Sequence, residues 1–208
     1  QRKPAMPVVE GEVLYDGIGA TGGYPQAQRW LFWACILNGA AGFTYGANGI
    51  WQVNTRQKLY GPSPHGMSWG NTPWEDAYQL PGSEQLGLAK RLLARYPWWQ
   101  FEPHPEWTEP GWTKELNDLP FTCGRHDVPM AAGIPRKVRF IYIPLGTWLQ
   151  WVKEIEKKVR YRAKFFNPVN GDEQNLGEVK PDAKGNWKCP RMPMFQDWVL
   201  VLEAIGAK

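Results

Sequence analysis

The strongest constraint on the fold is a change in the pattern of apolar residues near Trp99. Before this point, short apolar segments alternate with segments of helical periodicity, and after it only strand-like segments recur. Alternating strands and helices are typical of a parallel α/β arrangement, whereas consecutive strands joined by turns are typical of an antiparallel β-domain. The sequence therefore predicts two regions with different folds.

The first region has the order strand, helix, strand, long loop, helix. Residues 6–13 and 41–46 are the predicted strands, and residues 26–38 and 83–96 are the predicted helices. The first helix (QAQRWLFWACILN) is apolar nearly all round, which predicts burial on a sheet or between layers. The second is amphipathic, and a long loop over residues 47–74 precedes it. This order predicts two β/α units whose strands pair in parallel.

The second region reads as strands separated by turns. Residues 138–143 (VRFIYI), 161–166 (YRAKFF) and 197–203 (DWVLVLE) are predicted strands. Turn sequences such as NPVNG and KGN lie between them. The pattern predicts an antiparallel, sandwich-like β-domain.

Charge and hydropathy exclude two classes of partner. The formal net charge is only +4, and the basic cluster over residues 153–164 is interrupted by two Glu residues. A nucleic-acid-binding surface has a denser basic footprint, so we expect no nucleic-acid partner. No apolar run reaches the length needed to cross a bilayer, so we expect no membrane partner.

The cysteines and histidines show no metal-ligand spacing. Cys35, Cys123 and Cys189 lie far apart, and no two are spaced as a CxxC pair. A Cys123–Cys189 disulfide is one pairing that the sequence leaves open. We expect no metal and no cofactor. The 13 Trp residues are the unusual feature of the composition, because a flat indole ring suits the apolar face of a sugar.

The glycine pattern of residues 17–22 (GIGATG) matches GxGxxG between a strand and a helix, as in dinucleotide-binding folds. The preceding strand, however, carries Glu10 and Glu12, where a buried parallel strand is normally apolar. The next strand ends in Ala-Asn-Gly, without an acidic residue for a ribose. A flexible loop is therefore the favoured interpretation.

Acidic and amide side chains follow the two predicted parallel strands. Glu10, Glu12 and Asp16 lie at or beyond the carboxyl end of the first strand. In a β/α barrel these ends carry the catalytic residues, and a carboxylate there can act as nucleophile or as general acid/base. The alternative interpretation is that these are solvated loop charges.

The second strand is followed by aromatic and amide residues. Tyr45, Asn48, Trp51 and Gln52 would lie on the same rim as Glu12. An aromatic ring beside hydrogen-bonding amides and a carboxylate is the composition of a sugar subsite. Packing alone is the alternative role for Tyr45 and Trp51.

Several motifs resemble one family. The segments VVEGEVLYD (residues 8–16) and AAGFTYGANGIWQ (residues 40–52) resemble the seventh and eighth strands of apiosidase-like glycoside hydrolases. The segments AKFFNPVNG (residues 163–171) and DWVLVL (residues 197–202) resemble the β-domain appended to that family, which is labelled collagen-binding. The resemblance covers nearly the whole chain.

The resemblance implies a (β/α)₈ barrel and a retaining mechanism with two carboxylates. Glu12 occupies the position of the nucleophile, and Asp16 stands where family members often have Glu. Arg29 would anchor the end of the first helix near the site. The implied substrate-binding residues are Tyr15, Asp16, Tyr45, Asn48 and Trp51.

The resemblance also implies a division of the chain and a partner. Residues 1–107 would be the last two β/α units of the barrel, residues 108–120 a linker and residues 121–208 the β-sandwich domain. A whole barrel needs roughly 250 residues, so we expect the N-terminal half of the barrel, with its acid/base carboxylate, on a separate chain or upstream. The expected substrate is a complex, plant-type polysaccharide, and the resemblance implies a secreted or periplasmic location. The alternative function is a non-catalytic carbohydrate-binding or interaction module.

Overall fold

The structure is a computed structural model, and it describes residues 6–18, 23–50, 54–58, 72–111 and 128–206. The chain divides into two compact units. The first consists of Gln1–Ile36 and Ala40–Arg95, and the second of Leu37–Gly39 and Tyr96–Lys208. The change of sequence pattern near Trp99 lies close to this division.

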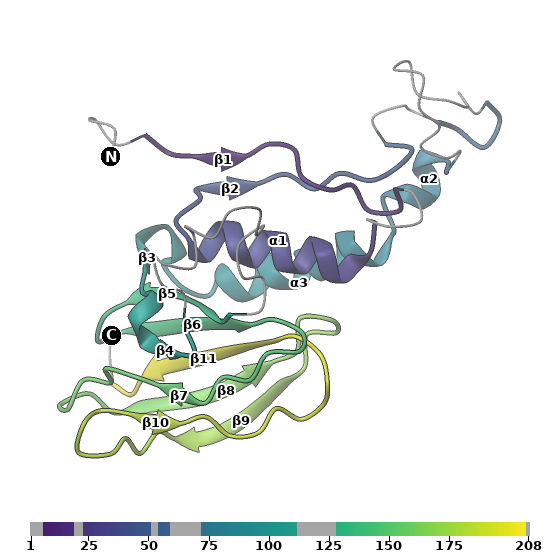
Figure 1. Cartoon of the computed structure of the whole chain (residues 1–208). Helices are drawn as coiled ribbons and strands as arrows, with labels where there is room; N and C mark the ends of the chain where they lie inside the picture. Colours follow the sequence, from purple (N-terminus) through teal and green to yellow (C-terminus); the bar gives the residue numbers. More distant parts are fainter. Residues whose placement is uncertain (1–5, 19–22, 51–53, 59–71, 112–127, 207–208) are drawn as a thin grey trace, which may run out of the picture. The chain divides into compact units, whose positions relative to one another are not determined.

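The described part of the first unit contains these strands and helices, labelled in Figure 1: β1 (Val9–Glu10), α1 (Pro25–Leu37), β2 (Gly42–Phe43), α2 (Trp74–Ala77) and α3 (Pro81–Leu93). Strands β1 and β2 pair in parallel, with Val9 opposite Gly42 and Glu10 opposite Phe43. The predicted parallel pairing is therefore confirmed. Both strands are shorter than predicted, and the short helix α2 begins where the predicted long loop ends.

Helix α1 begins with Pro25, whose fixed φ and missing amide hydrogen suit the first turn of a helix. Its most buried residues recur every three or four positions, among them Phe32, Trp33, Ile36 and Leu37. The remaining apolar side chains of the helix are half-buried. One stripe of the helix is therefore packed more completely than the rest of its surface.

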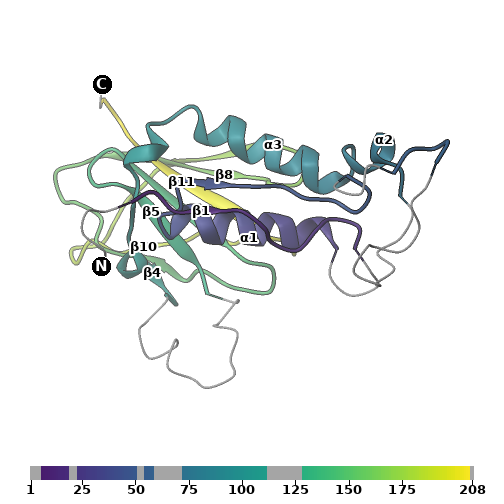
Figure 2. The same cartoon turned by 90° about the horizontal axis from the view of Figure 1, so that it is seen from above.

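Helix α3 is amphipathic, as predicted, and starts at a proline in its first turn. Leu86, Leu92 and Leu93 are buried, whereas Lys90 and Arg91 lie in the last turn, where positive charge favours the helix dipole. Helices α1 and α3 lie side by side (Figures 1 and 2). In the described part of the chain, no helix combines the length and the apolar character needed to cross a membrane.

The second unit is built of strands and two 3₁₀ turns. It contains η1 (Trp98–Gln100), β3 (Glu102–Pro103), η2 (Pro105–Trp107), β4 (Thr108–Glu109), β5 (Met130–Ile134), β6 (Val138–Ile143), β7 (Trp151–Val152), β8 (Tyr161–Phe166), β9 (Glu173–Glu178), β10 (Trp187–Lys188) and β11 (Trp198–Ala204). One sheet has the order β3-β5-β6-β11-β8-β9 and the other has the order β10-β7-β4. Every pairing in both sheets is antiparallel, which confirms the antiparallel β-domain.

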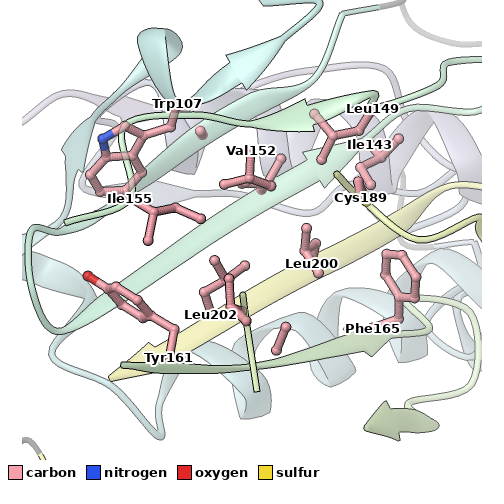
Figure 3. Packing of buried hydrophobic residues seen from close by; sticks show 14 of the residues in the cluster. Trp107, Ile143, Leu149, Val152, Ile155, Tyr161, Phe165, Cys189, Leu200 and Leu202 are labelled. Carbon is pink, nitrogen blue, oxygen red and sulfur yellow. The ribbon is translucent and has the colours of Figure 1, made fainter. Parts of the chain in front are cut away.

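A hydrophobic core lies against one face of the large sheet (Figure 3). Ile141, Leu200 and Leu202 from β6 and β11 meet Val152 from β7 and Leu149 before it, and none is more than 1% exposed. Complete burial of each such side chain contributes about 1.5–3 kcal/mol relative to an exposed position. This core holds the two sheets of the unit together.

The cysteines of the described residues are free thiols. Cys35 is half-buried, and Cys189 is buried in the core of the second unit. Burial raises the pKa of the Cys189 thiol to about 12, so it behaves as a small apolar side chain. Cys123 lies outside the described residues.

Candidate active site

The parallel pairing of β1 and β2 is interrupted and then resumes. The amide of Thr44 donates to the Glu10 carbonyl at 3.0 Å, which ends the first ladder. Asp16 and Ala47 then form a parallel bridge. Between these two pairings, residues 11–15 after β1 lie opposite only residues 44–46 after β2. The longer segment forms a loop, and Glu12 lies on it.

The carboxylate of Glu12 is exposed and is held by a tyrosine. The Tyr15 hydroxyl donates to Glu12 Oε1 at 2.8 Å. The hydrogen bond to Glu12, followed by partial burial and by the Glu12 charge, raises the pKa of Tyr15. The phenol therefore stays protonated and remains a donor at neutral pH.

The ring of Tyr15 is positioned by a glycine. A Cβ at Gly46 would lie 2.7 Å from the ring, which is closer than real Cβ atoms approach. The ring thus lies directly over the backbone of Gly46, just after β2. A side chain at position 46 would displace the tyrosine and with it the donor to Glu12.

Asp16 is the buried carboxylate of the site, with 2% of its surface exposed. Its Oδ2 accepts hydrogen bonds from the Gly82 amide at 2.9 Å and from the Tyr45 hydroxyl at 3.1 Å. Burial, followed by the Asp16 charge, raises the pKa of Tyr45. Asp16 therefore fixes the strand end to the start of α3 and is not open to solvent as Glu12 is.

Asn48 is also buried, with 2% exposure. Its Nδ2 lies 3.4 Å from both the Gly17 carbonyl and Thr72 Oγ1, while its backbone amide donates to the Asp16 carbonyl at 2.9 Å. Its side-chain oxygen finds no hydrogen-bond partner among the described residues. Asn48 thus belongs to the buried layer of the site.

A polar layer also joins the two long helices of the unit. Arg29, 6% exposed, donates through Nη1 to Gln85 Oε1 at 2.6 Å. The neighbouring Gln28 donates through Nε2 to the Leu14 carbonyl, close to the Glu12 loop. Arg29, which was predicted to anchor the end of the first helix, therefore connects α1 to Gln85 of α3.

The structure thus separates the predicted residues into two layers. Glu12 and Tyr15 form the outer pair, whereas Asp16, Tyr45 and Asn48 form the buried layer beneath. Trp51 and most of the glycine motif, Gly19–Gly22, lie outside the described residues. No group of three potential metal-binding side chains occurs in the described ranges.

Sequence reasoning missed two glycines of this site. Gly46 carries the Tyr15 ring, and Gly82 donates its amide to Asp16. A Cβ at Gly82 would lie 2.4 Å from Asp16 Oδ2, so only glycine fits there. No signal in the sequence marked Gly82, because it lies just before the predicted helix of residues 83–96, whereas α3 begins at Pro81 and Gly82 lies in its first turn.

The fold resembles part of the structures of glycoside hydrolases. A solved structure described as a glycoside hydrolase matches 100% of this chain with a TM-score of 0.76 and 21% identity. The crystal structure of a glycoside hydrolase family 5 protein from Bacteroides vulgatus ATCC 8482 matches 97% of it with a TM-score of 0.72 and 20% identity. The chain spans 44% and 42% of the length of these two proteins.

Comparison of the sequence with protein families gives a more specific result than the fold. Residues 1–100 match the family described as "Apiosidase-like, catalytic domain". Residues 125–203 match the family described as "Putative collagen-binding domain of a collagenase". The predicted resemblance to apiosidase-like glycoside hydrolases with their appended domain is therefore confirmed. A search of curated proteins gave no match.

Proposed function

We propose that this chain contributes the nucleophile to the active site of a retaining glycoside hydrolase, and that Glu12 is that nucleophile. The observation that carries the proposal is the exposed Glu12 carboxylate, whose Oε1 accepts a hydrogen bond from Tyr15 at 2.8 Å. It lies just beyond the end of a parallel strand, which is where β/α barrels place catalytic groups. No described residue forms a hydrogen bond with its second oxygen, which is left free to attack.

The reaction follows from this arrangement. Glu12 Oε2 forms a bond to the anomeric carbon while the bond from that carbon to the leaving oxygen breaks, and a general acid protonates that oxygen. Water then attacks the glycosyl ester, the deprotonated acid accepts its proton, and Glu12 is released as a carboxylate. The Tyr15 hydroxyl keeps the carboxylate oriented through both steps.

We propose that the acid/base carboxylate comes from β/α units outside these 208 residues. Two carboxylates lie near Glu12 in the sequence, but Glu10 Oε1 accepts the Glu12 amide at 3.3 Å and Asp16 is buried. Parallel sheets normally have covered strands, whereas Val8 and Val9 are 67% and 58% exposed. Further strands beside β1 would cover these valines and complete a barrel.

The substrate we propose is a complex, plant-type polysaccharide. The support is the match of residues 1–100 to the apiosidase-like family. An outer carboxylate held by a phenol suits attack on a glycosidic bond and requires no metal or cofactor.

The proposal is tested by trapping the glycosyl-enzyme intermediate. The protein, produced with any chain that accompanies it in its natural source, is treated with 2-deoxy-2-fluoroglycosides and its peptides are analysed by mass spectrometry. We expect one sugar attached to Glu12. Glu12→Gln should abolish the label and lower kcat about a thousandfold or more, because the covalent step is lost.

Glu10→Gln is the matched control, since this carboxylate lies two residues earlier, at the end of β1, and should leave labelling intact. A label on another carboxylate, or hydrolysis that persists in Glu12→Gln, would refute the nucleophile assignment. Glycan binding that survives Glu12→Gln without hydrolysis in any assembly would instead favour a non-catalytic binding module.

A further inference from the structure

The second unit has a hollow of its own on the face of the large sheet opposite the core. It encloses about 290 Å³ and is open to solvent. Its lining comes from the three neighbouring strands β11, β8 and β9 and consists of Arg162, Ala163, Lys164, Glu173, Asn175 and Glu203. The volume is at the lower end of ligand pockets, which suits a single small ring.

A bulge in β9 shapes the hollow. The pairing register shifts between Ala163, opposite Gly177, and Lys164, opposite Asn175, so that Leu176 is the extra residue. Gly177 has φ +82° and no atom within 4 Å of the place a Cβ would take. The Asn175 Oδ1 accepts the Gly177 amide at 2.8 Å and stabilises the bulge. Bulges often redirect side chains beside binding sites.

The charges of the hollow compensate one another. Lys164 Nζ lies 3.2 Å from Glu173 Oε2 and 3.3 Å from Glu203 Oε1. The Tyr96 hydroxyl donates to the same Glu203 oxygen, and its ring centre lies 6.0 Å from Lys164 Nζ. With Arg162 included, two cations face two carboxylates. The ammonium between the carboxylates disfavours a metal cation, and the carboxylates disfavour an anion.

The side chains that line the hollow can form further hydrogen bonds with a ligand. Each carboxylate can accept several hydrogen bonds, and the Asn175 amide nitrogen can donate two. Arg162 is exposed, and its guanidinium makes no hydrogen bond within the described part of the chain. The lining therefore offers both donors and acceptors, and its two cations balance its two carboxylates.

We propose that this hollow binds a neutral, hydroxyl-rich ligand, namely one ring of a saccharide. Hydroxyl groups both donate and accept, so a sugar satisfies carboxylates and cationic donors together. This site is lined by the second unit alone, and it is separate from the proposed nucleophile. The inference therefore goes beyond the hydrolase activity and gives the appended domain a binding function.

The test is an NMR titration of the isotope-labelled whole chain with glucose, galactose, xylose and arabinose. We expect saturable amide shifts at Ala163, Lys164 and Asn175 with at least one of these sugars. Arg162→Met removes the donors of an exposed cation in the lining and should weaken binding about tenfold. Arg191→Met replaces an exposed arginine outside the hollow and should leave the affinity unchanged.

A second variant and two charged ligands test whether the hollow prefers neutral sugars. Asn175→Asp keeps the acceptor for Gly177 but removes the amide donors, so it should also weaken binding. Tighter binding of glucuronate or of spermidine than of the neutral sugars would overturn the proposal, as would unchanged signals at Ala163, Lys164 and Asn175 with all four sugars. Glu12→Gln should leave this binding intact, so failure of one proposal does not imply failure of the other.

Discussion

At the residue scale, two tyrosines that follow paired strands have different surroundings. Tyr15 donates to the exposed Glu12 at 2.8 Å, and Tyr45 donates to the buried Asp16 at 3.1 Å. In both pairs the acceptor is an anion, which opposes ionisation of the phenol and helps to raise its pKa. The first tyrosine therefore orients an outer carboxylate, whereas the second fixes a buried one.

The coupling of Tyr15 to Glu12 is directly measurable. Glu12→Gln removes the anionic acceptor that is the leading cause of the raised pKa of Tyr15. We therefore expect that pKa to fall towards its ordinary value of 10.0. The measurement is an NMR pH titration with tyrosine rings labelled at Cζ. Glu10→Gln should leave the midpoint in place, and an unchanged midpoint in Glu12→Gln would contradict the contact.

At the element scale, the start of α3 depends on a carboxylate from a distant segment. Leu80 precedes the helix and has no side-chain acceptor, so the capping acceptor must come from elsewhere. Asp16 Oδ2 accepts the Gly82 amide at 2.9 Å and places negative charge at the positive end of the helix dipole. One side chain therefore joins the strand end to the helix.

Removing this carboxylate should loosen α3. Asp16→Ala leaves the Gly82 amide and the Tyr45 hydroxyl without their acceptor in a buried place, which costs about 2–4 kcal/mol. Hydrogen exchange of the α3 amides, followed by mass spectrometry, should become faster. Asp76→Ala removes a partner from an exposed ion pair with Arg56 and should change exchange little. Equal protection in both variants would show that Asp16 does not hold the helix.

A buried arginine joins elements of the second unit in a comparable way. Arg139 of β6 is 1% exposed, and its guanidinium lies 4.0 Å from the centre of the Trp107 ring. It donates to the Lys153 carbonyl at 2.8 Å and pairs with Glu156 at 2.8 Å. Glu156 also accepts the Tyr161 hydroxyl at 2.7 Å, so the network extends to β8.

This network should make the second unit sensitive to acid. Burial opposes the charge of Glu156, but the hydrogen bond from Tyr161 and the Arg139 charge outweigh it and lower its pKa below 4.5. A lowered pKa in the folded state stabilises the fold above the unfolded value, and this stability is lost as the pH falls through the folded value. Acid should therefore weaken the unit below about pH 4.5.

Glu156→Gln tests this directly. The variant should lose about 1–3 kcal/mol near pH 7, because the buried Arg139 keeps its charge without a counter-ion. Its stability should then change less between pH 5 and pH 3 than that of the parent. Urea unfolding at each pH provides the measurement. Glu154→Gln alters a neighbouring exposed carboxylate and should retain the parent pH dependence.

At the scale of the whole molecule, the two units differ in how their sheets are completed. The described residues of the second unit form nine strands in two antiparallel sheets, and the residues of the core cluster all belong to that unit. The first unit has a two-stranded parallel sheet with exposed valines. An antiparallel sheet can be complete on its own, whereas parallel sheets occur almost always with covered strands.

The core of the second unit predicts that residues 96–208 fold without the rest of the chain. Expressed alone, this segment should give dispersed amide signals and a single cooperative unfolding transition. The physical reason is that the core cluster runs from Trp107 to Leu202 without a side chain from the first unit. Collapsed signals without a transition would show that the first unit is required.

The sequence by itself determined the order and type of the main elements. Residues 138–143 and 161–166 are strands as predicted, and α1 and α3 lie within a few residues of their predicted bounds. These properties follow from local periodicity and from the proline and glycine signals at element ends. The family motifs likewise placed Glu12 and its neighbours at the strand ends.

Only the tertiary structure decided how each carboxylate is used. Glu12 and Asp16 are four residues apart, yet one is exposed beside Tyr15 and the other is buried against Gly82, 66 positions further along the chain. The hollow of the second unit likewise depends on a register shift between β8 and β9. Burial and pairing register depend on distant segments, and a local pattern contains no information about which distant amide or strand will meet a given side chain.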